Sequence, residues 1–323
     1  LLKIMNLKKS DNPKKVALIG VGRWGYNILN TLDSIEELDL THVVTTKQLK
    51  LEYKNQNPKL LSNWKDILNF EVDAVIIATP PATHSCILEW FIKNNTPCFI
   101  EKPLCLDYET ALFLKDLAKS KNVPVFVDHT QLFQPALSEI LNAVDFTSVK
   151  RINLEGMGDG PFREDLSILW DWGSHDISIM LKMLNKMPNS VSGYSTNTFV
   201  KYEFHYDNNL NVSVTNSNLS MLKKRNITVY EKDRIITFSE FPKNEFSIYE
   251  KSNFPNNNLL KHISSIVYDR DEDKPLYRAL EYFGISLLNN QTDMFDLDTA
   301  CNVIKLLGLA DKAINLNNTV SVS

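Results

Sequence analysis

The feature that most constrains the fold of this chain is a glycine-rich segment near its start. An apolar run from Lys15 to Ile19 leads directly into Gly20-Val21-Gly22-Arg23-Trp24-Gly25, and helical spacing continues from Tyr26 to Leu32. In a strand followed by Gly-x-Gly-x-x-Gly and a helix, the first glycine allows a tight turn and the second lets the backbone approach a pyrophosphate. The third lets the helix and the strand pack closely, and the helix N-terminus offers unpaired N–H groups to the phosphates. We therefore expect a dinucleotide site formed by Gly20, Gly22, Arg23, Trp24 and Gly25.

The ribose end of this site departs from the usual pattern. The second strand, residues 39–45, ends where an acidic residue normally holds the ribose 2′-hydroxyl. The chain has Thr45, Thr46 and Lys47 there instead. Hydroxyl groups followed by a cation suit a 2′-phosphate, so the sequence favours NADP over NAD. The alternative is that Lys47 is a solvated surface charge.

Strand and helix patterns alternate through the first part of the chain. Residues 72–79 form a continuous apolar run, which is typical of a strand buried on both faces of a parallel sheet. Helical spacing over 84–94, a strand at 98–100, a helix capped by Asp107 and a strand at 123–127 follow. The alternation predicts an α/β fold for residues 14–127, a Rossmann domain with a doubly wound parallel sheet.

Beyond residue 128 the pattern changes. Short alternating runs with turn residues between them predict antiparallel strands at 149–154, 199–205, 210–216, 227–231 and 234–239. Helical periodicity returns at 276–288 and 297–314, and 252–258 reads as a loop. We expect residues 128–323 to form an α+β domain with an open, mainly antiparallel sheet.

Composition agrees with a two-domain protein. The chain has 323 residues, of which 43% are hydrophobic, and this length exceeds the size at which single cores usually divide. The net charge of −4, with both signs interspersed, gives no indication of nucleic-acid binding. The lysine-rich start lacks the apolar core of a secretory signal, and no run reaches membrane-spanning length. The four cysteines have no Cys-x-x-Cys spacing, so we expect no metal site, no disulfide framework and a cytoplasmic location.

Two further segments carry chemistry. Lys102, in Glu101-Lys102-Pro103, directly follows a parallel strand, where it would project toward a bound nicotinamide and could stabilise charge on a substrate oxygen. Asp171 and His175 are four residues apart and share one face of a helical turn. A carboxylate beside a histidine orients the ring and raises its basicity, which suits a general base. Taken singly, Lys102 could be a surface lysine and Asp171 a helix cap beside a structural histidine.

The combination of these motifs resembles the Gfo/Idh/MocA oxidoreductases. It consists of the glycine fingerprint, Thr79-Pro80-Pro81 with His84, Glu101-Lys102-Pro103, and Asp171-x-Gly173-x-His175. The resemblance covers the chain from about Lys15 onward and implies catalytic roles for Lys102, Asp171 and His175. It further implies cofactor contacts from Thr79, Pro80, Pro81, His84, Glu101 and Lys102.

One branch of the family, the dehydrogenases of nucleotide-sugar and surface-polysaccharide pathways, is especially similar. The shared residues include Trp24, Asn27, Pro135 and the stretch from Phe162 to Asp171. Some members of that branch oxidise C3 of a UDP-N-acetylglucosamine-type sugar. This chain departs from the branch at Trp172 and Ser174 and at the ribose position.

The resemblance implies reversible hydride transfer between NAD(P) and a secondary alcohol or ketone of a sugar or nucleotide sugar. In this mechanism His175 takes the hydroxyl proton, Asp171 supports His175, and Lys102 contacts the reacting oxygen. Lys102, Asp171 and His175 would thus also contact the substrate. Three further candidates for substrate contact are His129, Phe133 and Arg163, although packing for His129 and an ion pair with Asp165 for Arg163 are equally consistent with the sequence.

Two alternatives remain open at the level of sequence. One is an NADPH-dependent ketosugar reductase, which Thr45 to Lys47 favour. The other is a non-catalytic nucleotide-binding sensor on the same fold, which would not need Lys102, Asp171 and His175 together. The family resemblance also implies a homodimer or homotetramer formed through the C-terminal sheet, with no nucleic-acid or membrane partner.

Overall fold

The computed structural model describes residues 12–46, 58–160, 162–251, 260–269, 274–291 and 297–322. The chain divides into two compact units. Unit 1 comprises the described residues of Leu1–Thr130 and Pro275–Ile304, and unit 2 those of Gln131–Lys274 and Lys305–Ser323. Among the helices described, none has the length and apolar character needed to cross a bilayer.

Unit 1 is built on a parallel sheet. Its strands in the described residues are β1 (Lys14–Ile19), β2 (Leu38–Val44), β3 (Lys59–Leu61), β4 (Ala74–Ile77), β5 (Cys98–Glu101) and β6 (Val125–Asp128). They lie in the order β3-β2-β1-β4-β5-β6, and every neighbouring pair is parallel. This is the doubly wound order of a Rossmann domain, as the sequence predicted.

The helices of unit 1 cover both faces of this sheet. The described α-helices before residue 130 are α1 (Arg23–Leu32), α2 (His84–Lys93) and α3 (Tyr108–Lys121). Because crossovers between parallel strands are right-handed, chain movement in opposite directions from β1 places α1 on one face and α2 and α3 on the other. Strand β4 is accordingly buried along its whole length, and β1 is buried from Val16 to Ile19. The predicted cap of α3 is also present, since the Asp107 carboxylate accepts a hydrogen bond from Thr110 N at 2.8 Å.

A late segment of the chain packs with this first unit, which the sequence did not predict. Helix α6 (Pro275–Leu288) belongs to unit 1, and α7 (Leu297–Leu316) begins there. Gly284 gives α6 its close approach, because a Cβ atom on Gly284 would lie 2.7 Å from the Cβ atom of Glu37. Phe283 adds an edge contact with Phe99, at 5.4 Å between ring centroids. A division of the chain at residue 128 alone therefore misplaces α6, whose apolar face completes the Rossmann core.

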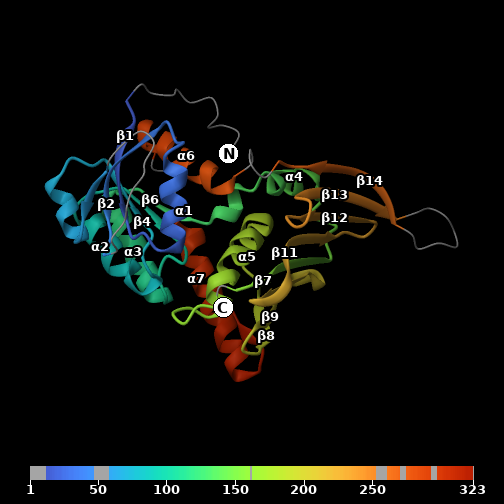
Figure 1. The fold of residues 1–323 in the computed structure, drawn as a ribbon. Helices are drawn as coiled ribbons and strands as arrows, with labels where there is room; N and C mark the ends of the chain where they lie inside the picture. The colour runs from blue at the N-terminus through green and yellow to red at the C-terminus, as the bar shows by residue number, and fades with distance from the viewer. Residues whose placement is uncertain are drawn as a thin grey trace. The chain divides into compact units, whose positions relative to one another are not determined.

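Unit 2 contains a larger, mixed sheet (Figure 1). In spatial order its described strands are β14 (Leu260–Val267), β13 (Glu245–Lys251), β12 (Arg234–Ser239), β11 (Leu219–Tyr230), β7 (Arg151–Asp159), β10 (Asn211–Ser217), β9 (Phe199–His205), β8 (Ser190–Ser195) and β15 (Val320–Ser321). Only β7 and β10 pair in parallel within this set; the other neighbours are antiparallel. The predicted open, mainly antiparallel sheet is confirmed. The predicted loop at 252–258 lies outside the described residues.

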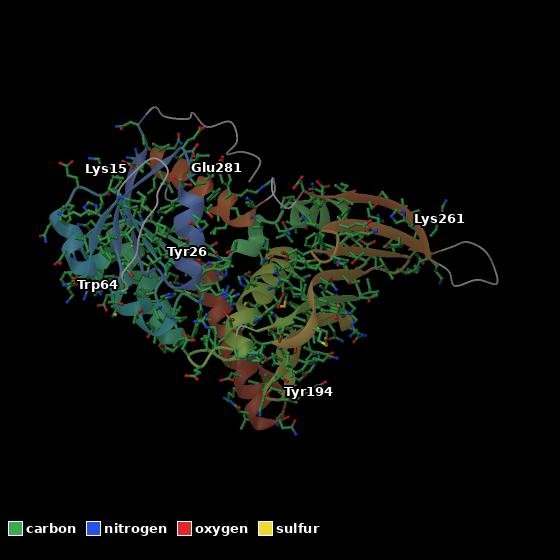
Figure 2. The ribbon with its side chains drawn as sticks, in the orientation of Figure 1. Lys15, Tyr26, Trp64, Tyr194, Lys261 and Glu281 are labelled. Atoms are coloured by element: carbon green, nitrogen blue, oxygen red, sulfur yellow. The ribbon has the colours of Figure 1, made fainter. Side chains whose placement is uncertain are left out.

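Helix α5 (Ile168–Leu184) packs on this sheet against β7, β9 and β10, and α4 (Pro135–Ala143) packs against β12 and β13. The cap of α5 is Ser167, whose side chain accepts a hydrogen bond from Trp170 N, so the reading of Asp171 as the cap is wrong. At one end of the sheet β14 is exposed along its whole length, and Lys261 marks this strand in Figure 2.

Candidate functional site

The glycine loop has the shape that a dinucleotide needs. Gly20 has φ +93°, a left-handed conformation that favours glycine, and a Cβ atom there would lie 2.8 Å from the carbonyl oxygen of Ala78. A Cβ atom on Gly25 would overlap the Gly20 carbonyl oxygen, so Gly25 lets α1 begin against the turn. At Gly22, by contrast, a Cβ atom would meet nothing within 4 Å. The loop is therefore closed by protein on two sides and open at the N-terminus of α1, where a pyrophosphate would bind.

The other predicted cofactor residues fall at the ends of the neighbouring strands of unit 1. Thr45 and Thr46 directly follow β2, and Thr45 N donates to Leu61 O at 3.0 Å. Lys47 lies outside the described residues, so its prediction stays open. Thr79 to Pro81 follow β4. The Thr83 hydroxyl donates a hydrogen bond to the Thr79 hydroxyl at 2.8 Å. The turn between them is closed by a hydrogen bond from Thr83 N to Pro80 O. All the described positions share the carboxyl edge of the parallel sheet, where ligands bind in this architecture.

Lys102 stands beside a pair of buried carboxyl groups. Glu101 ends β5, and Asp128 is its register partner on β6. Burial, together with the Asp128 charge, raises the pKa of Glu101 well above its usual range. Burial raises the pKa of Asp128 to about 6, against hydrogen bonds that lower it. Lys102 favours the ionised forms of both acids, and the Trp24 indole hydrogen-bonds Glu101. Sequence reasoning missed Asp128, because only strand register places it opposite Glu101.

The Lys102-Pro103 peptide bond is cis. His129 follows β6 and is 5% exposed, and its backbone N–H donates to Val127 O at 2.8 Å. Phe133, which belongs to unit 2, is 8% exposed. The burial of both rings agrees with a packing role, and their contact with substrate stays a prediction.

In unit 2, α5 carries both members of the predicted acid–base pair, four residues apart on one continuous helix. Asp171 lies in its first turn and is part-buried. Arg163 grips Asp165 with two nitrogens, Nε to Oδ1 at 2.9 Å and Nη2 to Oδ2 at 2.6 Å, and its Nη1 lies 3.4 Å from Asp171 Oδ1. The ion pair that the sequence offered for Arg163 and Asp165 is therefore present. Its third contact ties the segment before α5 to the helix turn that carries Asp171.

A buried polar network lies on the side of α5 that faces the sheet. Asp176 is 1% exposed and accepts hydrogen bonds from Arg225 Nη1 at 2.9 Å and Asn216 Nδ2 at 2.7 Å. The Arg225 guanidinium also stacks on Trp172, 5.3 Å from the ring. Gly156 leaves room for the group, since a Cβ atom there would lie 2.8 Å from Trp172 and 2.9 Å from Asn216. These contacts fix the rotation of α5 about its axis, and hence the direction in which Asp171 and His175 point. Sequence reasoning missed them; a charged residue within an apolar helix was their only local signal.

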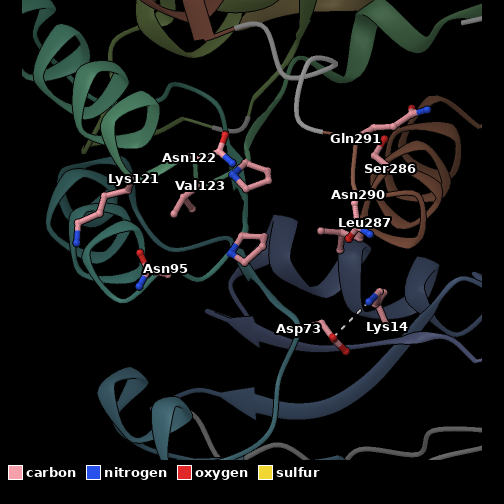
Figure 3. Close-up of a pocket in the computed structure, with 12 residues that line it drawn as sticks. Lys14, Asp73, Asn95, Lys121, Asn122, Val123, Ser286, Leu287, Asn290 and Gln291 are labelled. Atoms are coloured by element: carbon pink, nitrogen blue, oxygen red, sulfur yellow. Dashed lines mark ion pairs between the residues drawn. The ribbon is translucent and has the colours of Figure 1, made fainter.

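Unit 1 also has a cavity of about 450 Å³ that is distinct from these sites. Its lining includes Lys14, which begins β1, Asp73, which precedes β4, and Asn122, which follows α3 (Figure 3). The Lys14 ammonium lies 3.5 Å from the Asp73 carboxylate within it. The cavity therefore lies at the amino edge of the sheet, opposite to the edge where the glycine loop opens.

Comparison with known proteins supplies independent findings. Residues 14–129 match a family model, Gfo/Idh/MocA, described as an oxidoreductase family with an NAD-binding Rossmann fold. UDP-N-acetylglucosamine 3-dehydrogenase of Acidithiobacillus ferrooxidans is 30% identical over 129 residues, which are 39% of this chain and 40% of that protein. The NAD⁺-dependent scyllo-inositol 2-dehydrogenase of Bacillus subtilis is 26% identical over 202 residues, 57% of this chain and 58% of that protein. The chain thus matches about half the length of these curated relatives.

Solved structures extend the likeness to the whole fold. A candidate oxidoreductase from Magnetospirillum magnetotacticum MS-1 has a TM-score of 0.81 and 28% identity, over 93% of this chain and 100% of that one. The Acidithiobacillus ferrooxidans UDP-N-acetylglucosamine 3-dehydrogenase has a TM-score of 0.82 over 95% of this chain and 99% of that one. Its identity in that alignment is 20%, so this second likeness shows the fold alone.

Proposed function

Since residues 14–129 match the Gfo/Idh/MocA oxidoreductase family, we propose that this chain transfers a hydride between NAD(P) and a secondary alcohol or ketone of a sugar or nucleotide sugar. One observation carries the proposal: the glycine loop and the Glu101-Lys102-Pro103 segment lie at the same carboxyl edge of one parallel sheet. A dinucleotide on that loop would place its reactive ring toward the ends of the neighbouring strands.

The residues of unit 1 suit such a cofactor. The open N-terminus of α1 supplies backbone N–H groups to the pyrophosphate, with Gly22 leaving the approach clear. Thr45 and Thr46 directly follow β2, and the residue after this strand contacts the ribose in this type of fold. We propose that Thr45, Thr46 and Lys47 favour a 2′-phosphate, and hence NADP. When bound, the nicotinamide supplies the hydride acceptor or donor.

The catalytic roles that we propose follow from the chemistry of each side chain. Lys102 donates a hydrogen bond to the reacting oxygen and stabilises its developing charge. His175 removes the hydroxyl proton during oxidation and returns it during reduction. Asp171 favours the imidazolium form of His175 through its negative charge. Arg163 acts as a positioning residue through its contact with Asp171 at 3.4 Å.

The named relatives support the substrate class. Proteins similar to this chain act, by their names, on UDP-N-acetylglucosamine and on scyllo-inositol. Both substrates present a ring with secondary hydroxyl groups. We propose a nucleotide sugar in preference to a free cyclitol, because the UDP-N-acetylglucosamine enzyme is 30% identical over its matched segment and the scyllo-inositol enzyme 26%.

We also propose that the chain forms a homodimer or homotetramer through the sheet of unit 2. The support is apolar exposure on its strands: Leu219 is 61% exposed, Leu222 69% and Val267 62%. Leu219 and Leu222 lie on β11 and Val267 on β14 of the same sheet, and exposed apolar side chains of this size are typical of a subunit interface.

A substrate panel tests the proposed function. Purified protein is mixed with NAD⁺ or NADP⁺ and with UDP-N-acetylglucosamine, UDP-glucose, free N-acetylglucosamine or scyllo-inositol, and reduced nicotinamide is followed by absorbance. The proposal predicts reduction of the cofactor with a UDP-sugar and a ketosugar product by mass spectrometry. Turnover of scyllo-inositol alone would overturn the nucleotide-sugar assignment. Binding of a cofactor without turnover of any sugar, in either direction, would favour a sensor.

A further inference from the structure

His84 occupies an unusual position in unit 1. It is the first residue of α2 and is fully buried. Its Nδ1 atom lies 2.8 Å from the carbonyl oxygen of Pro103, and its Nε2 atom lies 2.8 Å from the carbonyl oxygen of Thr79. Both ring nitrogens therefore face backbone acceptors at full hydrogen-bond distance.

These two contacts determine the protonation of the ring. A carbonyl oxygen accepts hydrogen bonds and has no proton to donate, and a neutral imidazole carries a single N–H. In a neutral His84, the lone pair of one ring nitrogen would face a carbonyl oxygen at 2.8 Å, and the two would repel each other. Rotating the ring by half a turn would put carbon atoms at that distance from the same oxygens. Only the imidazolium form, with two N–H donors, satisfies both contacts.

Two effects oppose this charge. Burial disfavours an ion, and the N-terminus of α2 disfavours a cation. Two short hydrogen bonds from a charged donor stabilise the imidazolium form, and such bonds are stronger than those of neutral donors in a protein interior. Because the neutral ring would both lose one of these bonds and leave a buried carbonyl facing a lone pair, the balance favours the charged ring.

The two carbonyl groups belong to the two segments that the proposed chemistry needs. Thr79 forms a wall of the glycine loop, since a Cβ atom on Gly20 would lie 2.9 Å from Thr79 Cγ2. Pro103 directly follows Lys102. A single ring thus joins the wall of the cofactor loop to the segment that carries the lysine, across the ends of β4 and β5.

We propose that His84 is a positioning residue: as an imidazolium it ties the carbonyl groups of Thr79 and Pro103 together, and so fixes Lys102 relative to the glycine loop. The role given to Lys102 rests on the proposed function, whereas the tie itself does not. His84 thus acts through the backbone of both segments and has no need to touch the cofactor.

The protonation is tested on the wild-type protein without any substrate. Nitrogen-15 NMR of histidine-labelled protein at neutral pH, with the His84→Gln variant for assignment, should show two protonated ring nitrogens for His84. His42 is the internal reference, because burial, with a contribution from Lys59, lowers its pKa and keeps it neutral. A His84 ring with one bare nitrogen would overturn the proposal.

The positioning role is tested with His84→Gln and the matched control His42→Gln, which replaces another buried histidine of unit 1, on β2. Hydrogen exchange should increase at residues 79–84 and 101–105 in His84→Gln and not in the control. With NADP⁺ and UDP-N-acetylglucosamine, kcat should fall by roughly 10²-fold, the effect of a misplacement of about 1 Å, while the Kd for NADP⁺ changes little. Equal exchange and equal kcat in the two variants would overturn the role. An absence of turnover in the wild type would count against the proposed function. The NMR and hydrogen-exchange results would then still decide whether His84 links the carbonyl groups of Thr79 and Pro103.

Discussion

Replacing either Gly22 or Gly25 by alanine adds one methyl group to the same loop, yet we expect the two variants to fail in different ways. At Gly25 the new methyl group would overlap the Gly20 carbonyl oxygen. Gly20 has little freedom to yield, because its φ is +93° and its N–H donates to Val44 O at 2.9 Å. At Gly22 the methyl group would meet no protein atom within 4 Å.

The magnitudes follow from these surroundings. Overpacking one methyl group costs about 1–3 kcal/mol, and the better helix propensity of alanine returns at most about 1 kcal/mol. Gly25→Ala should therefore lower the free energy of unfolding by about 1–2 kcal/mol, which corresponds to a fall in Tm of several degrees. Gly22 has φ −76° and ψ −166°, which alanine adopts without strain, so Gly22→Ala should cost no more than about 1 kcal/mol for the weaker helix cap. Its methyl group would occupy the approach to the pyrophosphate and should weaken NAD⁺ binding at least tenfold, about 1.4 kcal/mol.

Thermal denaturation and isothermal titration with NAD⁺ measure the two effects separately. The expected pattern is a stable Gly22→Ala variant that binds NAD⁺ poorly and a Gly25→Ala variant with reduced Tm. A folded Gly22→Ala variant with unchanged NAD⁺ affinity would refute the assignment of this loop to the pyrophosphate.

Three further predictions address the ribose, the buried ion pair and the carboxyl pair. Lys47→Ala should weaken NADP⁺ binding much more than NAD⁺ binding in titration; equal losses would mean that Lys47 does not read the 2′-phosphate. Arg225→Met leaves Asp176 buried at 1% exposure without its ion-pair partner and should cost about 3–5 kcal/mol in urea denaturation, and a loss below about 1 kcal/mol would contradict the network. The pKa of Asp128 is raised to about 6, above its unfolded value near 3.9, so its contribution to stability is present below about pH 4 and is lost as pH rises to about 6. Asp128→Asn should thus gain in Tm relative to wild type between pH 4 and about pH 7, and a constant Tm difference would contradict the burial of this acid.

Features determined by short segments could be predicted from the sequence. The glycine loop and the buried strand β4 follow from local patterns. The spacing of the glycines indicates the loop, and a continuous apolar run indicates a strand that is buried on both faces. The cap of α3 by Asp107 was local in the same way. For α5, the sequence offered Asp171 as the cap, whereas Ser167, a residue of an equally suitable type, supplies it.

Features that depend on pairing between distant segments could not be predicted. Arg225 reaches Asp176 only because β11 lies beside β7 beneath α5, and no local pattern encodes that register. The packing of α6 in unit 1 depends on Gly284, because a side chain there would collide with Glu37. The sequence alone does not show that these two residues are in contact. The catalytic roles of Lys102 and His175 stay predictions, since they concern chemistry that only kinetics tests.

The rate of hydride transfer per folded molecule tests directly whether His175 is the general base of a dehydrogenase. Reduced nicotinamide formed from NADP⁺ and UDP-N-acetylglucosamine is measured for wild type, His175→Ala and the control His205→Ala, which alters a histidine on β9 that hydrogen-bonds Ser192 and Asn211. We expect wild type and His205→Ala to turn over, and kcat of His175→Ala to fall about 10²–10⁴-fold with an unchanged Kd for NADP⁺. Full activity of folded His175→Ala would contradict this role.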